Sequence, residues 1–203
     1  TEGKQNKAVV VIHGWKGNKD SFKSIASFLK LDGTTWFFPE APFDIKGDKG
    51  KKTWSYQNDD GKWEVEKPKA MLDDFFKSVV FEKFKPKKVY VMGFSQGATV
   101  CYEFILRLKH KFAGVFPIAG FLRDPDGEIV IHPSQFDTLI LIGHGREDDI
   151  VPFEASKIAF EQKNRPSLVL LTRQSLPVLD RDKYPELLGQ KISCAHNQVL
   201  LTS

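Results

Sequence analysis

Short apolar runs, most of them β-branched, recur along the 203-residue chain, and longer polar or amphipathic stretches separate them. Such runs are typical of strands that are buried on both faces. Strands that alternate with helices predict an α/β fold with a mostly parallel central sheet, flanked by helices on both faces. The expected strands span residues 8–12, 34–38, 88–92, 113–119, 138–142 and 167–171.

The stretches between these runs predict the helices and loops. Apolar residues at helical spacing predict helices over 21–31, 68–84, 96–109 and 153–163. Residues 44–67 are polar and rich in Gly, Lys and Asp, and we expect a long surface loop there. Residues 173–203 form an atypical tail with no clear pattern. The length suits a single domain over 1–203.

The composition excludes several classes of protein. Hydrophobic residues make up 41% and charged residues 28% of the chain, as in soluble globular proteins. A net charge of +4 is too small to indicate a nucleic-acid partner. No window approaches 18 apolar residues, so we expect no stable membrane insertion. The basic run 83–88 leaves contact with an anionic membrane surface open, although we favour a solvated helix end.

Cysteine usage bears on the compartment. Cys101 and Cys194 are too few for a disulfide framework, and we expect two reduced thiols in a cytoplasmic protein. The polar segment 1–7 has no apolar signal region, but Thr1 leaves open whether a signal peptide was removed before it. The oligomeric state is also left open.

The segment Gly93-Phe94-Ser95-Gln96-Gly97 fits the pattern Gly-x-Ser-x-Gly. It follows an expected strand and precedes an expected helix, which is the context in which this pattern exposes a nucleophilic serine on a sharp turn. The field at the helix N-terminus favours developing negative charge there. We therefore predict that Ser95 is a nucleophile. The alternative is a glycine-lined turn with an inert serine.

A nucleophilic serine needs a base, and the base needs an orienting carboxylate. On this kind of sheet the chain order is serine, acid, histidine. Three adjacent carboxylates follow the fifth expected strand, at Glu147, Asp148 and Asp149, and spacing alone does not choose among them. A base that follows the acid leaves His196 of the five histidines.

A tetrahedral intermediate also needs two preorganised N–H donors. We expect the amide of Gln96 to supply one, and the amide of Trp15, in the glycine-flanked loop after the first strand, to supply the other. Aromatic residues concentrate in the loops that would surround the site, and we expect Trp54, Phe94 and Phe121 to contact substrate. Such residues are equally compatible with anchors that hold long loops to the core.

Four segments together resemble the α/β-hydrolase superfamily, and within it the phospholipase/carboxylesterase group, which includes acyl-protein thioesterases. The related small serine hydrolases of the fungal and human ovarian-tumour type are also similar. The segments that carry the resemblance are His13-Gly14-Trp15, Phe38-Pro39-Glu40-Ala41-Pro42 with Trp54-Ser55-Tyr56, Gly93 to Ala98, and His144 to Pro152. The last segment matches the acid loop His-Gly-x-x-Asp-x-x-Val-Pro of that group, and this match selects Asp148. The resemblance runs from about residue 8 to 172.

The resemblance implies hydrolysis of carboxylic esters or thioesters through an acyl-enzyme on Ser95, with Asp148 and His196 completing the triad. It implies no metal and no cofactor, and a small-molecule or acyl-chain ester as substrate. A peptidase or a carbohydrate acetyl esterase with the same triad remains an alternative, as does a hydrolase fold used only for binding. Acyl-chain length, leaving group and the choice between ester and thioester stay open.

Overall fold

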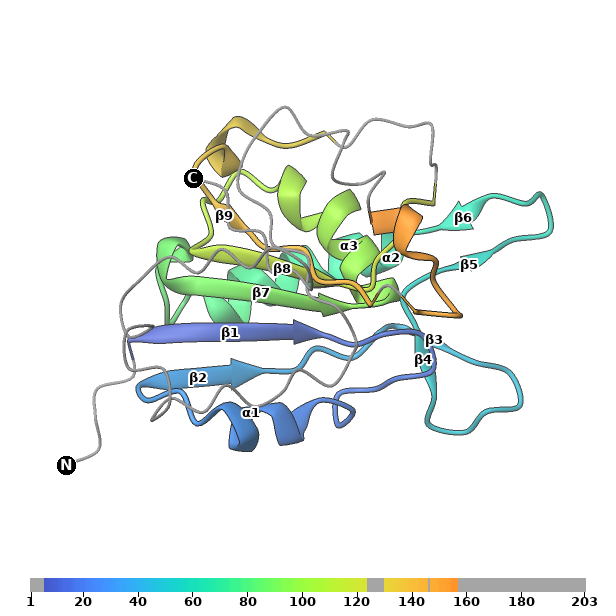
Figure 1. Ribbon diagram of the computed structural model, residues 1–203, viewed down its shortest axis with the longest axis horizontal. Helices are drawn as coiled ribbons and strands as arrows, with labels where there is room; N and C mark the ends of the chain where they lie inside the picture. The colour runs from blue at the N-terminus through green and yellow to red at the C-terminus, as the bar shows by residue number, and fades with distance from the viewer. Residues whose placement is uncertain (1–5, 124–129, 146, 157–203) are drawn as a thin grey trace.

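The computed structural model describes residues 6–123, 130–145 and 147–156. Within them a five-stranded sheet has the order β2-β1-β7-β8-β9, and every pair of neighbours is parallel (Figure 1). The strands are β1 (Lys7–Ile12), β2 (Thr34–Phe37), β7 (Val89–Phe94), β8 (Gly114–Ile118) and β9 (Leu139–Ile140). The first five expected strands and the parallel sheet are thereby confirmed. The sixth expected strand, 167–171, lies outside the described residues.

The register of the central strands brings their carboxyl ends to one edge of the sheet. Val10 of β1 pairs with Val91 of β7, which in turn pairs with Val115 of β8. At the far end Gly93 pairs with both Ile12 and Pro117. The loops that follow these three strands therefore leave the sheet side by side, at the right of Figure 1.

The helices are α1 (Lys23–Leu29), α2 (Glu66–Phe75) and α3 (Gln96–Glu103). A π-helical turn, Phe76–Val80, extends α2, and a 3-10 turn, Ile105–Arg107, follows α3. All three expected helices in this part of the chain are present, although α3 ends six residues before the expected boundary of 109. Residues 153–156 are also helical, and the rest of the expected helix 153–163 lies outside the described residues.

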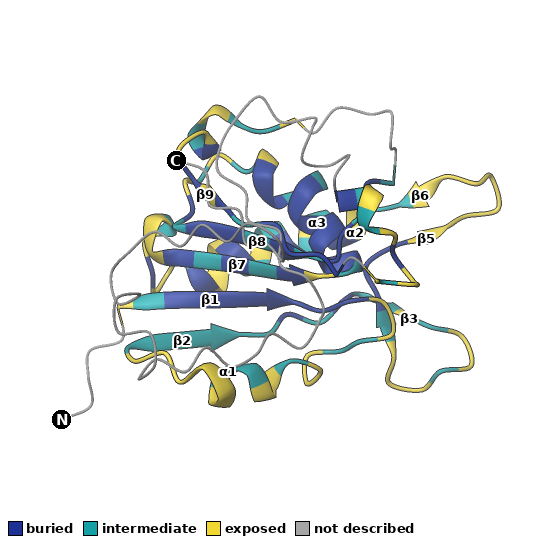
Figure 2. Cartoon of the chain, viewed as in Figure 1, coloured by how far each residue is buried: buried dark blue, intermediate teal, exposed yellow. Residues whose placement is uncertain are grey.

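The main core lies between one face of the sheet and the helices α2 and α3. Val10 and Ile12 of β1 share a cluster of buried side chains with Leu72 of α2 and Val100 of α3. Burying aliphatic side chains stabilises the fold by roughly 1.5–3 kcal/mol for each. Figure 2 shows the central strands and α3 as the most buried elements, whereas α1 is mostly exposed.

The expected surface loop over 44–67 is in fact built from two small antiparallel ribbons, so that prediction was wrong in detail. β3 (Phe43–Asp44) pairs with β4 (Lys52–Thr53), and β5 (Tyr56–Gln57) pairs with β6 (Trp63–Glu64). The turn of the second ribbon is closed by Asn58, whose side chain accepts hydrogen bonds from the amides of Asp60 and Lys62. Both ribbons lie at the edge where the central strands end.

No helix in the described ranges is long and apolar enough to cross a membrane. Cys101 is a free, buried thiol on α3, and burial raises its pKa. Cys194 lies outside the described residues.

Candidate active site

Ser95 sits in a strained turn between β7 and α3. Its φ of 52° and ψ of −116° lie in a region that residues with a side chain rarely adopt. The Ser95 amide donates a 2.8 Å hydrogen bond to the carbonyl of Ile118 on β8, which ties the turn to the neighbouring strand. This is the geometry of a nucleophile turn, with the serine at the carboxyl edge of the sheet.

The two glycines of the motif are required by close backbone contacts. A Cβ at Gly97 would lie 2.2 Å from the carbonyl oxygen of Ile12, and one at Gly93 would lie 2.3 Å from the carbonyl oxygen of Gly97. The turn is therefore packed directly on the end of β1. Larger residues at either position would push Ser95 away from the edge of the sheet.

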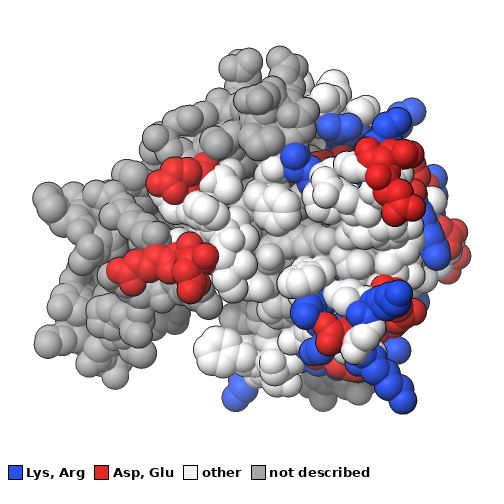
Figure 3. Space-filling view, turned by 90° about the vertical axis from the view of Figure 1, so that its right-hand side faces the viewer, with Lys and Arg blue, Asp and Glu red and all other residues white. Residues whose placement is uncertain are grey.

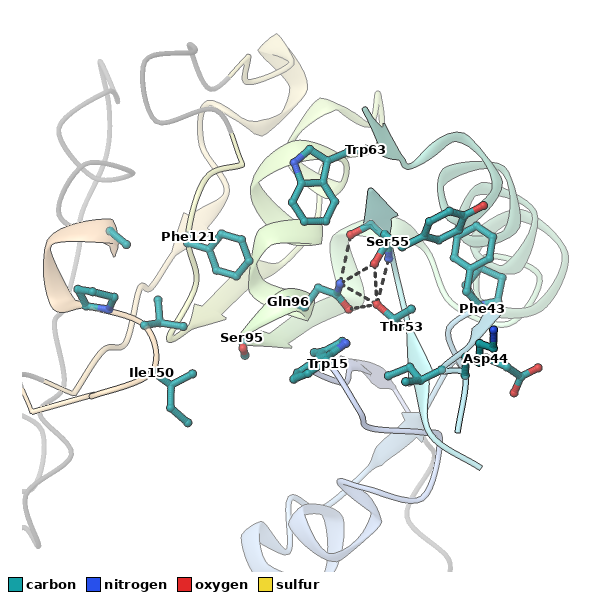
Figure 4. A pocket seen from close by; sticks show the side chains of 17 residues that line it. Trp15, Phe43, Asp44, Thr53, Ser55, Trp63, Ser95, Gln96, Phe121 and Ile150 are labelled. Carbon is teal, nitrogen blue, oxygen red and sulfur yellow. Dashed lines mark hydrogen bonds between the residues drawn. The ribbon is translucent and has the colours of Figure 1, made fainter. Parts of the chain in front are cut away.

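Ser95 borders a pocket of about 840 Å³. Its walls come from the loop after β1, from the two ribbons, from the segment after β8 and from residues 150–155 (Figure 4). The large apolar side chains that line it include Trp15, Phe43, Tyr56, Trp63, Phe121 and Ile150. Figure 3 looks onto the edge of the sheet at which the central strands end. Uncharged residues fill the centre of this view, and charged residues lie around them.

The expected oxyanion donors lie next to the nucleophile. Trp15 and Gln96 both line the pocket beside Ser95. Within the described part of the chain, neither backbone N–H has a hydrogen-bond acceptor. The loop after β1 is held by a 3.1 Å hydrogen bond from the Gly17 amide to the Gly14 carbonyl, and Lys16 adopts a φ of 59°. Both amides are thus available to a developing oxyanion.

The Gln96 side chain attaches α3 to the segment between the two ribbons. Its Oε1 accepts a 2.9 Å hydrogen bond from the amide of Trp54, which fixes the orientation of the side-chain amide. Its Nε2 donates to Thr53 Oγ1 at 2.9 Å and to Ser55 Oγ at 3.1 Å. The residue that carries one oxyanion amide therefore also positions a wall of the pocket.

The three residues expected to contact substrate have different surroundings. Phe121 lines the pocket. Trp54 is fully buried, with its indole N–H donating to the His13 carbonyl at 2.8 Å, and it lines no part of the pocket. Phe94 also lies outside the lining and packs against Phe22 with ring centroids 5.5 Å apart. Trp54 acts as a loop anchor, which was the alternative interpretation of these aromatic residues.

The loop after β9, which contains the expected acid, orients the carboxylate of Asp148. Asp148 Oδ1 accepts hydrogen bonds from the amides of Ile150 and Val151, at 3.0 and 3.1 Å. Its Oδ2 lies 3.9 Å from Nε2 of His144. Asp148 is partly buried, whereas Glu147 and Asp149 are exposed. Asp148 is therefore the carboxylate whose position the loop determines.

His144 joins this loop to the rest of the edge. Its imidazole is buried, with Nε2 donating to the Val151 carbonyl at 2.7 Å and Nδ1 hydrogen-bonded to Ser156 Oγ at 2.6 Å. The Ser156 hydroxyl also lies 3.1 Å from the Gly120 carbonyl. Both ring nitrogens are occupied, so His144 supports the acid loop and is not free to act on Ser95.

The other described histidines are also accounted for. His13 is buried, and its Nε2 accepts from the Ala41 amide at 3.1 Å while Nδ1 lies 2.8 Å from the Gly14 carbonyl. His110 and His132 precede β8 and β9, at the edge of the sheet opposite Ser95. The predicted base, His196, lies outside the described residues.

A partly buried ion pair that sequence reasoning missed lies behind the pocket wall. Arg123 pairs with Glu103 of α3, and its Nη2 donates to Ser55 Oγ at 2.8 Å. The guanidinium also lies over the Trp63 ring, 5.4 Å from its centroid. Burial lowers the pKa of Arg123 to about 10, so it remains charged at neutral pH. No motif marks these residues, because the pair joins segments far apart in sequence.

Among the described residues no group of three or more His, Cys, Asp or Glu side chains is placed to hold a metal ion. The candidate site consists of a strained serine, two amides that have no acceptor among the described residues, an oriented carboxylate and a mostly apolar pocket.

Comparison with known proteins identifies the family. A family model described as phospholipase/carboxylesterase matches residues 1–167. The chain belongs to the phospholipase/carboxylesterase family. The match ends before His196, so it includes Ser95 and Asp148 but not the predicted base.

Two curated relatives carry the same name. The acyl-protein thioesterase 1 of Kluyveromyces lactis is 26% identical over 162 residues, which cover 72% of this chain and 71% of that protein. The protein of the same name from Emericella nidulans is 29% identical over 119 residues, or 55% of this chain and 50% of the relative. The chain thus spans between half and about 71% of these two relatives.

A solved structure shows the same fold. The carboxylesterase of Bacillus cereus superposes with a TM-score of 0.67 at 14% identity, covering 91% of this chain and 88% of that one. The α/β-hydrolase fold expected from the sequence is thereby confirmed.

Proposed function

We propose that this protein is a serine hydrolase that cleaves carboxylic esters or thioesters through an acyl-enzyme on Ser95. The observation that carries the proposal is the strained turn at Ser95, which opens onto the apolar pocket beside two amides that no described residue engages. Strain at a serine in this position is costly and is typical of sites where it serves the reaction. Membership of the phospholipase/carboxylesterase family and the thioesterase names of the relatives agree with this activity.

In the proposed mechanism Ser95 Oγ attacks the acyl carbon while His196 takes the hydroxyl proton. The amides of Trp15 and Gln96 stabilise the oxyanion, a contribution of roughly 3–4 kcal/mol for each such donor in other enzymes. His196 then protonates the leaving alkoxide or thiolate, and water releases the acid by the reverse sequence. Asp148 accepts the imidazole N–H and stabilises the imidazolium.

The surroundings of the four described histidines support His196 as the base. His13 and His144 have both ring nitrogens engaged, and the other two lie at the far edge of the sheet. Asp148 is supported as the acid because its carboxylate is oriented by two backbone amides.

The pocket supports an acyl chain as the bound part of the substrate. Aromatic and aliphatic side chains dominate its lining, and Ile150 and Trp15 at its mouth are exposed. Burying apolar surface of a ligand contributes roughly 25 cal/mol per Å² before the costs of association.

A fluorophosphonate probe and a panel of nitrophenyl esters, a thioester and a peptide amide test the proposal. We expect covalent labelling of the native protein, turnover of esters and thioesters, and loss of both in Ser95→Ala. Ser78→Ala is the matched control, because Ser78 is an exposed helical serine bonded to Asp74. Equal labelling of Ser95→Ala would exclude Ser95 as nucleophile.

The same panel separates the alternatives. Fastest turnover of the peptide amide would indicate a peptidase. Absence of labelling and turnover in the native protein would indicate a hydrolase fold used for binding.

A further inference from the structure

The pocket contains a sheltered hydroxyl whose hydrogen-bonding partners are unusual. Ser55 lines the pocket but is only 4% exposed, and it lies beside Gln96 on the wall opposite the loop of Ile150 (Figure 4). Its Oγ accepts hydrogen bonds from Gln96 Nε2 at 3.1 Å and from Arg123 Nη2 at 2.8 Å. A serine hydroxyl has two acceptor positions and one proton.

Both partners of Ser55 Oγ are donors. The guanidinium of Arg123 has no acceptor atoms. The Gln96 side chain is fixed by the Trp54 amide, which donates to Oε1, so that Nε2 faces Ser55. The hydroxyl proton of Ser55 is therefore used by neither of them, and it has no acceptor elsewhere in the described residues.

The other buried polar side chains of the described pocket lining, Thr53 and Gln96, are already engaged. Thr53 Oγ1 has its one proton directed to the Ser55 carbonyl at 2.7 Å. Both atoms of the Gln96 amide are bonded to the segment 53–55. Asp44 and Lys46 also line the pocket but are exposed at its rim. Among the described lining residues other than Ser95, Ser55 is therefore the one with a buried hydroxyl whose proton is available to a ligand.

We propose that Ser55 is a specificity-determining hydrogen-bond donor, which selects ester or thioester substrates that carry an oxygen acceptor along their chain. An ether, keto or amide oxygen would accept the Ser55 proton where a plain alkyl chain would leave it unpaired. Arg123 makes the donor stronger, because a charged donor polarises the hydroxyl that accepts from it. Glu103 holds Arg123 in place and balances its charge.

The inference rests on the proposed function, and a binding experiment separates the two. Ser95→Ala protein is titrated with a plain alkyl ester and with analogues in which one methylene is replaced by an ether oxygen. The oxygen is moved one position at a time along the acyl chain and along the alcohol. Binding is followed by tryptophan fluorescence, since Trp15 and Trp63 line the pocket.

We expect one position of the oxygen to tighten binding about three- to tenfold over the methylene parent. The added change Ser55→Ala should abolish that preference. Thr53→Ser is the matched control, because it keeps a hydroxyl on the same wall and should keep the preference. The ratio of kcat/KM between each oxygen analogue and its methylene parent should show the same preference in the protein with Ser95 intact. Both substrates are measured on the same protein sample, so the ratio does not depend on the fraction that is folded.

The Ser55→Ala variant is expected to be less stable, because Arg123 loses a hydrogen-bond partner. The ratio of the affinities for two ligands does not depend on how much of the protein is folded, so it still tests the inference. Equal affinity for every oxygen analogue and its parent, or a preference that survives Ser55→Ala, would overturn the inference. Failure of both esters to bind would also overturn it. If the preference is present in binding but no ester is hydrolysed, the proposed function fails and the Ser55 site stands.

Discussion

Individual residues at the edge of the sheet are held in place by one another. Gly97 allows α3 to begin against the end of β1, the Ser95 amide bonds to β8, and Trp54 bonds to the carbonyl of His13. His13 is part of the same arrangement because its ring joins the loop after β1 to the segment around Ala41. Ser95 and the loop after β1 therefore share their supports.

The hydrogen bonds of His13 make a prediction about pH. Its Nε2 accepts from the Ala41 amide, so the proton lies on Nδ1 and the ring is neutral in the folded protein. Desolvation lowers its pKa below the ordinary value of about 6.5. As the pH falls below about 6.5, the unfolded chain binds a proton that the folded chain does not. Stability then decreases by up to about 1.4 kcal/mol per pH unit until the folded pKa is reached.

The variant His13→Asn tests this linkage. Asn keeps a donor near the position of Nδ1 but does not titrate, and it loses the acceptor for the Ala41 amide. We expect its unfolding free energy at about pH 7.5 to be roughly 1–3 kcal/mol lower than that of the native protein. Between about pH 7.5 and 5.5 its loss of stability in urea titrations should be smaller than the native loss. Parallel curves for the two proteins would contradict a neutral, buried His13.

At the residue scale the sequence predicts which residues gather at the pocket better than it predicts the depth of the aromatic residues. Ser95, Trp15 and Gln96 were selected by a motif with a defined backbone geometry, and all three line the pocket. Trp54 and Phe94 do not line it, because an aromatic residue in a loop gives no sign of its depth. The surroundings of Ser55 could not be predicted, because they depend on Arg123, a residue that only the folded chain brings to it.

Among the elements, the strands were the most predictable and the ribbons the least. A continuous β-branched run such as 8–12 has one favourable place, the centre of a sheet. Two-residue strands such as β3 and β5 are too short to show any periodicity, and each exists because a short connection brings its partner strand back beside it. The ends of α2 and α3 differ from the expected boundaries because π and 3-10 turns replace the last α-helical turns.

The acid loop carries a prediction at this scale. Asp148→Asn keeps an oxygen that accepts from the amides of Ile150 and Val151, so the loop should fold as before, but the imidazolium loses its counter-charge. We expect ester turnover to fall by about 10⁴-fold, the loss seen for the equivalent change in a serine protease. Asp149→Asn, at an exposed neighbouring position, should retain native turnover. Equal losses in the two variants would contradict Asp148 as the acid.

On the scale of the whole molecule, the described part of the candidate site is built from segments far apart in sequence. Trp15, Ser95 and Asp148 all fall within the family match of 1–167, whereas the predicted base, His196, lies beyond it. Sequence order selected His196 as the base by elimination. None of the four described histidines is placed to act on Ser95, so that prediction stays as it was.

Replacing the base tests whether the tail completes the site. His196→Ala should reduce ester turnover by several orders of magnitude, because no base would remove the proton from the Ser95 hydroxyl. The pocket should still bind the substrate. His110→Ala, at the opposite edge of the sheet, is the control and should keep native kcat. Native turnover in His196→Ala would show that the base is supplied from elsewhere.

The pairing of β1 with β7 has a consequence for how the molecule reaches its native state. Residues 8 and 89 are direct neighbours in the sheet, although α1, β2, both ribbons and α2 all lie between them in sequence. Closing so large a loop has an entropic cost that slows folding relative to chains rich in local contacts. Because Gly97 packs on the last residue of β1, the turn at Ser95 acquires its shape only after this distant pairing has formed. Catalytic competence should therefore emerge at a late stage of refolding.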